Sequence, residues 1–198
     1  MFFRVRTISK TLLDANMKHD GGWKLNTSRF IFDSPWFSLR QDELTLPNGE
    51  DITYTVVDHA GYAVVVPLLD DGRLVMEHVF RHPVQKTLLE CPMGGLDGNT
   101  PEQAAMRELE EETGYRAKSW KKLGQFYGSS GISNELFYVF LATDLTKDGE
   151  INLEATEQLE TELIPLQTLL KKIHAGEIES GPSSLAVLLA ADHLTESF

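Results

Sequence analysis

The most informative stretch of this sequence is residues 94–115, which read GGLDGNTPEQAAMRELEEETGY. Thr100, followed by Pro101 and Gln103, has the pattern of a helix N-terminal capping box with proline at the first helical position. Gly114 can end the helix, because glycine adopts left-handed backbone angles without steric cost. The spacing therefore predicts a helix over residues 101–113, about three and a half turns long.

Three carboxylates of this predicted helix share one face. Glu108, Glu111 and Glu112 are three and four positions apart, so they point into an arc roughly 100° wide. Like charges at this spacing repel each other, whereas a hard cation such as Mg2+ binds carboxylate oxygens and removes the repulsion. Because Ala105 and Leu109 border the arc, we expect Glu112 to lie at the edge of a cleft. A solvated acidic face is the alternative, and spacing alone does not separate the two.

The composition is typical of a globular protein that is large enough to bury its own hydrophobic core. The chain has 198 residues, of which 41% are hydrophobic and 24% are charged. A single cysteine, Cys91, excludes disulfide scaffolds and cysteine zinc clusters and fits a reducing, intracellular compartment. The formal net charge of −12 argues against nucleic acid and anionic membranes as partners. No apolar run approaches the roughly 20 residues of a membrane span, so we expect a cytoplasmic protein.

Turn residues and hydrophobic periods divide the chain into three predicted parts. These are an extension over residues 1–25, a small antiparallel sheet over residues 26–60 and an α/β domain over residues 61–198. Further signals are a hairpin turn at 46–49, a strand buried on both faces at 63–68, a return strand at 74–79, a strand at 136–143, and helices at 166–176 and from Pro182 onward.

The helix region resembles a known family motif. Residues 107–114, RELEEETG, resemble the second half of the Nudix box, R-E-U-x-E-E-x-G, where U is aliphatic. The first half, G-x5-E, departs from the family pattern: Asn99 stands in place of the first glutamate, the preceding loop is one residue short, and Tyr115 replaces the last aliphatic residue. The resemblance implies an α/β fold, the Nudix α/β/α sandwich with a mixed sheet, preceded here by the small N-terminal antiparallel sheet.

Motifs outside the box resemble the ADP-ribose pyrophosphatase branch of that family. They are the hairpin at 45–49, the segment VFRHP at 79–83, the segment ECPMG at 90–94 and the segment SGISNE at 130–135. The likeness implies substrate contacts from Arg81, Gly94, Gly131 and Glu135. An arginine at a strand end can also grip a phosphate or carboxylate through two N–H groups, and a surface ion pair is the alternative.

The same resemblance implies the metal ligands and the cofactor. The metal ligands would be the carboxylates of Glu108, Glu111 and Glu112 together with the backbone carbonyl of Met93. The implied cofactor is Mg2+, with Mn2+ as a substitute.

Catalytic roles are implied for Arg107, for Glu111 and for a glutamate in the loop before the last strand. Diphosphate hydrolysis needs a water activated by metal and a carboxylate. Counting back from Ile164-Pro165-Leu166, the matching loop position is Glu157, with Glu160 as the alternative. Glu111 could itself supply the base.

The sequence thus predicts Mg2+-dependent hydrolysis of the diphosphate in a nucleoside diphosphate linked to another group. ADP-ribose, cleaved to AMP and ribose 5-phosphate, is the leading substrate, and a nucleotide sugar is the close alternative. A regulatory Nudix-fold protein that binds a nucleotide without hydrolysing it is the alternative from another class. The altered first half of the box favours that alternative, and the retained helix glutamates oppose it.

A homodimer is the expected assembly. Four aromatic residues in the N-terminal sheet offer more apolar surface than a small sheet can bury alone: Phe30, Phe32, Trp36 and Phe37. The related branch commonly dimerises through this sheet, so we expect the partner's N-terminal residues to help line the substrate site.

Overall fold

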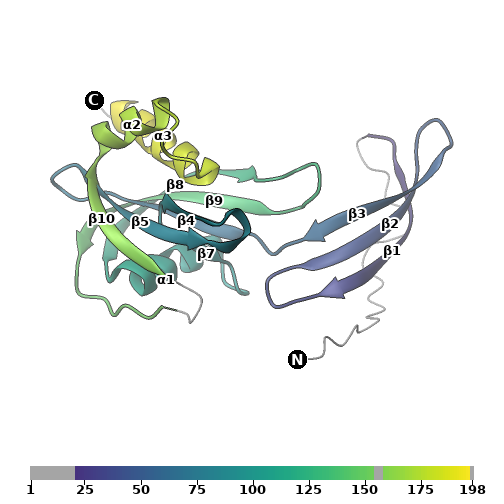
Figure 1. Cartoon of the computed structure of the whole chain (residues 1–198), viewed down its shortest axis with the longest axis horizontal. Helices are drawn as coiled ribbons and strands as arrows, with labels where there is room; N and C mark the ends of the chain where they lie inside the picture. The colour runs from purple at the N-terminus through teal and green to yellow at the C-terminus, as the bar shows by residue number, and fades with distance from the viewer. Residues whose placement is uncertain (1–20, 154–157, 197–198) are drawn as a thin grey trace. The chain divides into compact units, whose positions relative to one another are not determined.

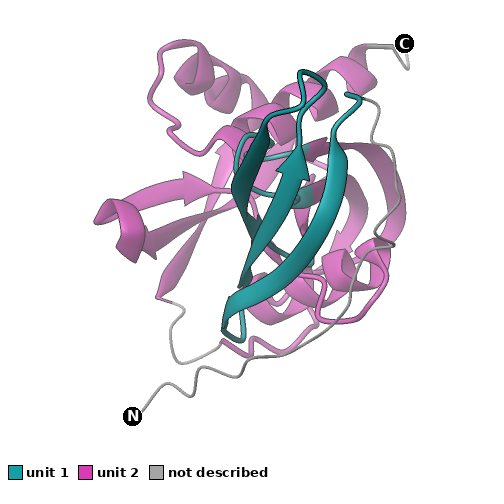
Figure 2. Cartoon of the chain, turned by 90° about the vertical axis from the view of Figure 1, so that its right-hand side faces the viewer, with its two compact units in different colours: residues 1–60, 127–136 teal, residues 61–126, 137–198 magenta. Residues whose placement is uncertain are grey.

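The structure is a computed structural model, and it describes residues 21–153 and 158–196. The chain divides into two compact units, residues 1–60 with 127–136 and residues 61–126 with 137–198 (Figure 2). The predicted extension lies mostly outside the described residues. Its last two positions, Lys24 and Leu25, already belong to the first strand. The three-part division into residues 1–25, 26–60 and 61–198 stays a prediction.

The first unit contains a three-stranded antiparallel sheet, as predicted (Figure 1). Its strands are β1 (Lys24–Asp33), β2 (Ser38–Thr45) and β3 (Asp51–Asp58), in the order β1-β2-β3. The predicted hairpin joins β2 to β3: the Leu46 N–H donates to the Glu50 carbonyl at 2.8 Å, and Gly49 has a φ of 88° that suits glycine. The hairpin fixes the register of the two strands.

Two sheets make up the centre of the second unit. One has the order β10-β5-β6, with β10 (Leu159–Pro165), β5 (Arg73–Arg81) and β6 (Lys86–Glu90) all antiparallel. A short 3-10 helix, η1 (His82–Val84), joins β5 to β6. The other sheet has the order β7-β4-β9-β8, with β7 (Met93–Gly95), β4 (Tyr62–Pro67), β9 (Leu136–Thr146) and β8 (Arg116–Tyr127). Because β4 pairs in parallel with β9 and antiparallel with β7, this sheet is mixed, as predicted.

Helices cover both sides of strand β4. Val64 and Val66 pack in one apolar cluster with residues of α2 (Leu166–His174) and α3 (Gly181–Glu196). Ala63 and Val65 point the other way, into a second cluster with α1 (Pro101–Thr113). All four side chains are fully buried, which confirms the predicted strand with two apolar faces. The layers are visible in Figure 1, where α2 and α3 lie on one side of the strands and α1 on the other.

None of the helices in the described part of the chain combines the length and the apolar composition that a membrane crossing requires. One face of each helix packs against the sheets.

Candidate active site

Helix α1 forms where the sequence predicts it and with the predicted ends. The Thr100 side chain accepts a hydrogen bond from the Gln103 N–H at 3.3 Å, and the Gln103 side chain accepts one from the Thr100 N–H at 3.1 Å. Pro101 occupies the first turn, and Gly114 ends the helix with a φ of 70°. These local interactions fix the helix register and therefore the direction of its acidic arc.

Two members of the acidic arc are buried. Glu108 is 5% exposed and Glu112 is 6% exposed, whereas Glu111 retains about a third of its side-chain surface (33%). Burial of two like charges one helical turn apart is costly unless polar or cationic groups compensate it. The solvated acidic face, which the spacing left open, is therefore wrong for Glu108 and Glu112.

Strand β7 supplies both the hydrogen bond and the space that these carboxylates need. The Met93 N–H donates to Oε2 of Glu112 at 3.0 Å. At Gly94, a Cβ would lie only 2.0 Å from Oε1 of Glu108, so any side chain there would displace the buried carboxylate. Glycine at this position allows the helix carboxylate to rest against the strand backbone.

Arg107 joins the helix to the loop that precedes it. Its guanidinium contacts Glu108 at 2.7 Å and Glu111 at 2.9 Å, and it donates to the Gly95 carbonyl at 2.8 Å and to Asp97 at 2.9 Å. Burial of Arg107 works against its charge, but the attraction of Glu108 and Glu111 outweighs it and raises the pKa of Arg107 above its ordinary value. Arg107 is therefore a permanent cation among the acidic side chains.

The donor chemistry of this site fits a hard divalent cation. Glu108, Glu111 and Glu112 offer carboxylate oxygens from one helix face, and Gly94 lets the Glu108 carboxylate lie directly against the backbone of β7. Within residues 21–153 and 158–196, no group of three acidic, histidine or cysteine side chains is arranged so that it could hold a metal ion. Arg107 instead bridges two of the three glutamates. A metal would therefore have to compete with that guanidinium for Glu108 and Glu111.

Arg81 is anchored by a buried carboxylate at the end of β5. Its Nε and Nη2 groups both donate to Oε2 of Glu90, at 3.0 and 2.6 Å. Glu90 is almost fully buried, whereas the Arg81 side chain is 41% exposed. Burial opposes the charge of Arg81, but the hydrogen bond to Glu90 and the attraction of Glu90, Glu112 and Glu77 raise its pKa. The guanidinium is thus held in place and still presents N–H groups to solvent.

Sequence reasoning missed the buried Glu77 near this site. Glu77 lies in β5 with 1% exposure and stands opposite Glu90 in the strand register. It also contributes to the field at Arg81 and, after desolvation, to the raised pKa of the buried Cys91 thiol. The available signal was a glutamate within the mostly apolar run Leu74–Val79, where His78 is the other polar residue, because a charge inside a buried strand needs a specific environment.

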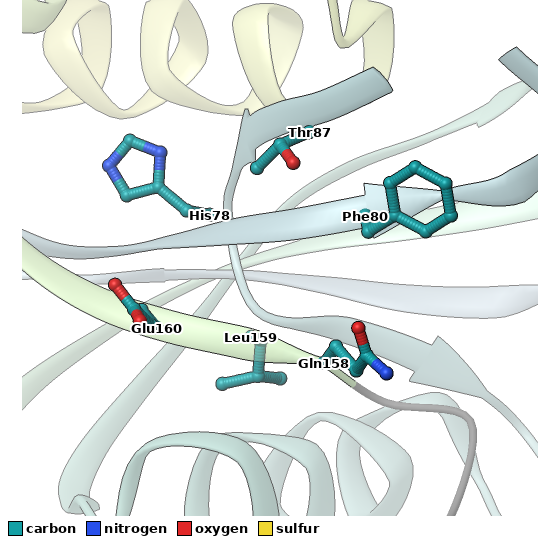
Figure 3. A pocket seen from close by; sticks show the side chains of 6 residues that line it. All are labelled: His78, Phe80, Thr87, Gln158, Leu159 and Glu160. Carbon is teal, nitrogen blue, oxygen red and sulfur yellow. The ribbon is translucent and has the colours of Figure 1, made fainter. Parts of the chain in front are cut away.

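The late-loop glutamates divide between described and undescribed residues. Glu157, the predicted base, lies outside the described residues. Glu160 stands opposite His78 in the register of β10 and β5, and both line a pocket of about 410 Å3 (Figure 3). Since successive side chains of a strand alternate, His78 lies on the opposite face of β5 from Glu77 and Arg81. Glu160 of β10, which pairs with His78, therefore lies on the opposite face of the sheet from Arg81 of β5.

The two remaining predicted contacts, Gly131 and Glu135, belong to the first unit. The Tyr54 hydroxyl donates to the Gly131 carbonyl at 2.6 Å. The Glu135 carboxylate lies 3.7 Å from Nδ1 of His59. A parallel bridge between Val57 and Ser133 further attaches this segment to the end of β3. The fold therefore holds both residues beside β3, and their role as substrate contacts stays a prediction.

Two protein-family domains together match nearly the whole described chain. Residues 59–182 match the NUDIX domain, and residues 23–57 match the nucleoside diphosphate sugar hydrolase N-terminal domain. The first match includes helix α1 and both sheets of the second unit, and the second match covers the three-stranded sheet. Each family description therefore coincides with a separate sheet system.

Two similar proteins and one solved structure support this family assignment. An ADP-ribose pyrophosphatase of Bacillus subtilis (strain 168) is 35% identical over 159 residues, covering 79% of this chain and 86% of the relative. A methanol dehydrogenase activator of Bacillus methanolicus is 31% identical over the same shares of the two chains. A solved structure of an ADP compounds hydrolase has the same fold, with a TM-score of 0.78 at 19% identity, covering 93% of this chain and 98% of that chain. The chain belongs to the NUDIX family and resembles its ADP-ribose pyrophosphatase branch.

Proposed function

We propose that this Nudix protein hydrolyses the diphosphate of ADP-ribose to AMP and ribose 5-phosphate with the aid of a divalent cation. The observation that carries the proposal is the pair of buried carboxylates, Glu108 and Glu112, held against β7 beside Gly94. A helix that buries two like charges is poorly suited to a purely structural role. The family match supports the reaction class, and the relative from Bacillus subtilis supports the substrate.

The residues that would hold the cation are Glu108, Glu111 and Glu112 with the Met93 carbonyl. Mg2+ is the proposed ion, because carboxylate and carbonyl oxygens are its preferred ligands, and Mn2+ would substitute. When bound, the cation neutralises diphosphate charge and lowers the pKa of a water attached to it. The Met93 N–H already fixes Glu112, so the carbonyl of the same residue is positioned by the strand that also binds the carboxylate.

Chain residues would perform the remaining tasks. The N–H groups of Arg81 that Glu90 leaves available would bind a phosphate oxygen, and Arg107 would hold the helix carboxylates in place. Glu157 would orient the attacking water and accept its proton, with Glu160 or Glu111 as the alternative base. Gly131 and Glu135 would contact the substrate.

A nucleotide sugar is the second candidate substrate, and the match of residues 23–57 to the nucleoside diphosphate sugar hydrolase N-terminal domain favours it. A panel of ADP-ribose and several nucleotide sugars, each assayed with Mg2+, with Mn2+ and with a chelator, tests the proposal. We expect the highest kcat/KM for ADP-ribose and no turnover with the chelator. Tight nucleotide binding without product would instead support the regulatory alternative.

We further propose a cytoplasmic homodimer that forms through the N-terminal sheet. The single buried cysteine and the acidic composition support the compartment. Exposed apolar side chains in the first unit support the dimer: Ile31 and Phe37 are each 37% exposed and Trp36 is 69% exposed.

The buried carboxylate of Glu112 provides a first prediction. Glu112→Gln should lower turnover at least about 100-fold, because the amide keeps an oxygen for the Met93 N–H but loses the charge that binds the cation. Glu110→Gln is the matched control, since Glu110 lies on the same helix but pairs with the exposed Arg116. Steady-state kinetics and Mg2+ titration are the measurements. Equal activity in the two variants would remove Glu112 from the metal site.

The late glutamates provide a second prediction. Glu157→Gln should reduce single-turnover hydrolysis about 100-fold with little change in substrate affinity, because general-base assistance acts mainly in the transition state. Glu160→Gln and Glu162→Gln should be mild, since Glu160 lines the pocket with His78 and Glu162 contacts His78 at 2.7 Å. A large loss confined to Glu160→Gln would move the base to that residue. Three mild effects would assign it to α1.

The aromatic surface of the first unit provides a third prediction. Light scattering at micromolar concentration should give the mass of a dimer for the wild type and of a monomer for Trp36→Glu, because a charge replaces the most exposed apolar residue of the sheet region. Leu188→Glu on α3, where the side chain is 38% exposed, is the control and should remain dimeric. A monomeric wild type would contradict the proposed assembly.

A further inference from the structure

A connection of only two residues joins the two sheets of the second unit. Strand β6 ends at Glu90 and strand β7 begins at Met93, so Cys91 and Pro92 span the step between the sheets. Each end of the connection carries a group of the candidate site. The Glu90 carboxylate anchors Arg81, and the Met93 N–H binds Glu112. The position of this connection therefore sets the spacing between the arginine and the proposed metal ligands.

Few polar groups are available to hold such a short connection. Pro92 has no backbone N–H, and its carbonyl accepts a hydrogen bond from the Val65 N–H of β4 at 2.9 Å. The single N–H of the connection belongs to Cys91, and it donates to the Oγ of Ser183 at 3.0 Å. Strand β4 and helix α3 thus hold the connection through one hydrogen bond each.

The hydroxyl that receives the Cys91 N–H is completely enclosed. Ser183 lies in the first turn of α3 and has no exposed surface, and Ser180 just before the helix is 6% exposed. The Ser180 hydroxyl donates to the Ser183 Oγ at 3.0 Å, and the Ser180 carbonyl accepts the N–H of Ser184 at 2.9 Å. A buried hydroxyl with this arrangement is oriented by the helix start, so it is a fixed acceptor.

We propose that Ser183 is a positioning residue for the metal site on the far side of the sheet. Cys91 packs in the apolar cluster of α2 and α3, whereas the neighbouring Met93 N–H reaches Glu112 of α1. Ser183, on the α3 side of the sheet, therefore holds the backbone segment whose Met93 N–H binds Glu112 on the α1 side. This inference rests on the proposed role of Glu112 and Met93 in holding the cation. Ser183 is not among the proposed metal ligands, and it acts through the Cys91-Pro92 connection.

Loss of the Ser183 hydroxyl has a definite physical consequence. The Cys91 N–H would be left buried without an acceptor, which is costly enough that the backbone is expected to shift toward another partner. A shift of this two-residue connection moves Met93 directly, because Pro92 is rigid at φ. The hydrogen bond to Glu112 would then lengthen and the cation would bind less tightly. Removal of an outer partner of a metal ligand commonly costs 10- to 100-fold in metal affinity.

The decisive experiment compares Ser183→Ala with Ser184→Ala in the full chain. Ser184 is the matched control, because it lies in the same helical turn and its hydroxyl bonds only the Ile178 carbonyl, at 3.3 Å, among the described contacts. Mg2+ affinity is measured by calorimetry, and amide hydrogen exchange is measured at Cys91 and Met93. We expect about tenfold weaker Mg2+ binding and at least about tenfold faster exchange at both amides in Ser183→Ala only.

Other outcomes separate this inference from the proposed function. If a folded Ser183→Ala binds Mg2+ as the wild type does, or if both alanine variants weaken binding equally, the positioning role is wrong. If the wild type itself binds no Mg2+, the proposed function fails. Exchange at Cys91 then still reports on the hydrogen bond alone.

A variant that keeps the acceptor is needed in case Ser183→Ala does not fold. Ser180→Ala removes only the hydroxyl that orients Ser183, and we expect about threefold weaker Mg2+ binding with faster exchange at Cys91. Unchanged binding and exchange in a folded Ser180→Ala would overturn the inference in that case.

Discussion

The burial of two carboxylates from α1 against the backbone of β7 is the constraint on which the second unit depends. A charge that leaves water must find polar partners, and here they come from the Met93 N–H and from Arg107. The close approach also requires a residue without a side chain, and Gly94 meets that requirement. The capping box at one end of α1 and Gly114 at the other keep the helix in the single register that satisfies these contacts.

The loop before α1 carries Asn99 where the family motif has its first glutamate, and it forms a tight turn. The Asn99 N–H donates to the Leu96 carbonyl at 2.8 Å, and positive φ angles at Asp97 and Gly98 turn the chain tightly. This turn brings the Asp97 carboxylate to Arg107 at 2.9 Å. Because the Asp97 side chain is largely exposed, the ion pair adds little stability, and its effect is to orient the guanidinium. The short loop therefore supplies an acidic partner for Arg107.

The two faces of the sheets differ in polarity. The side that packs against α2 and α3 is apolar and supplies cohesion, with Val64, Val66 and Leu169 fully buried in it. Toward α1, apolar packing is interrupted by the charged groups around Arg81. Those charges are tolerable because each is close to a group of opposite sign, and the raised pKa of Arg81 reflects that surplus of negative charge. The Cys91-Pro92 connection lies where the two environments meet.

The sequence by itself determined the elements whose signals are local. A cap, a terminal glycine and a turn act within a few residues, so helix 101–113 and the hairpin at 46–49 could be predicted from the chain alone. Strand β4 could also be predicted from its apolar run, because a strand covered on both faces excludes polar residues from both. The three helix glutamates were identified by their spacing, although spacing could not say which of them is buried.

Only the tertiary structure decided the features that depend on distant partners. Strand β8 was not predicted, because an edge strand is covered unevenly and its lysines break the alternation that marks a strand. Ser183 looked ordinary in the sequence and Glu77 stood out only as a charge within a mostly apolar strand, yet both are buried. Their partners lie on other elements: Glu90 on the next strand for Glu77, and Cys91, 92 positions away, for Ser183. Periodicity reports which face of an element is apolar, but the group that meets a buried polar atom is set by how the elements pack.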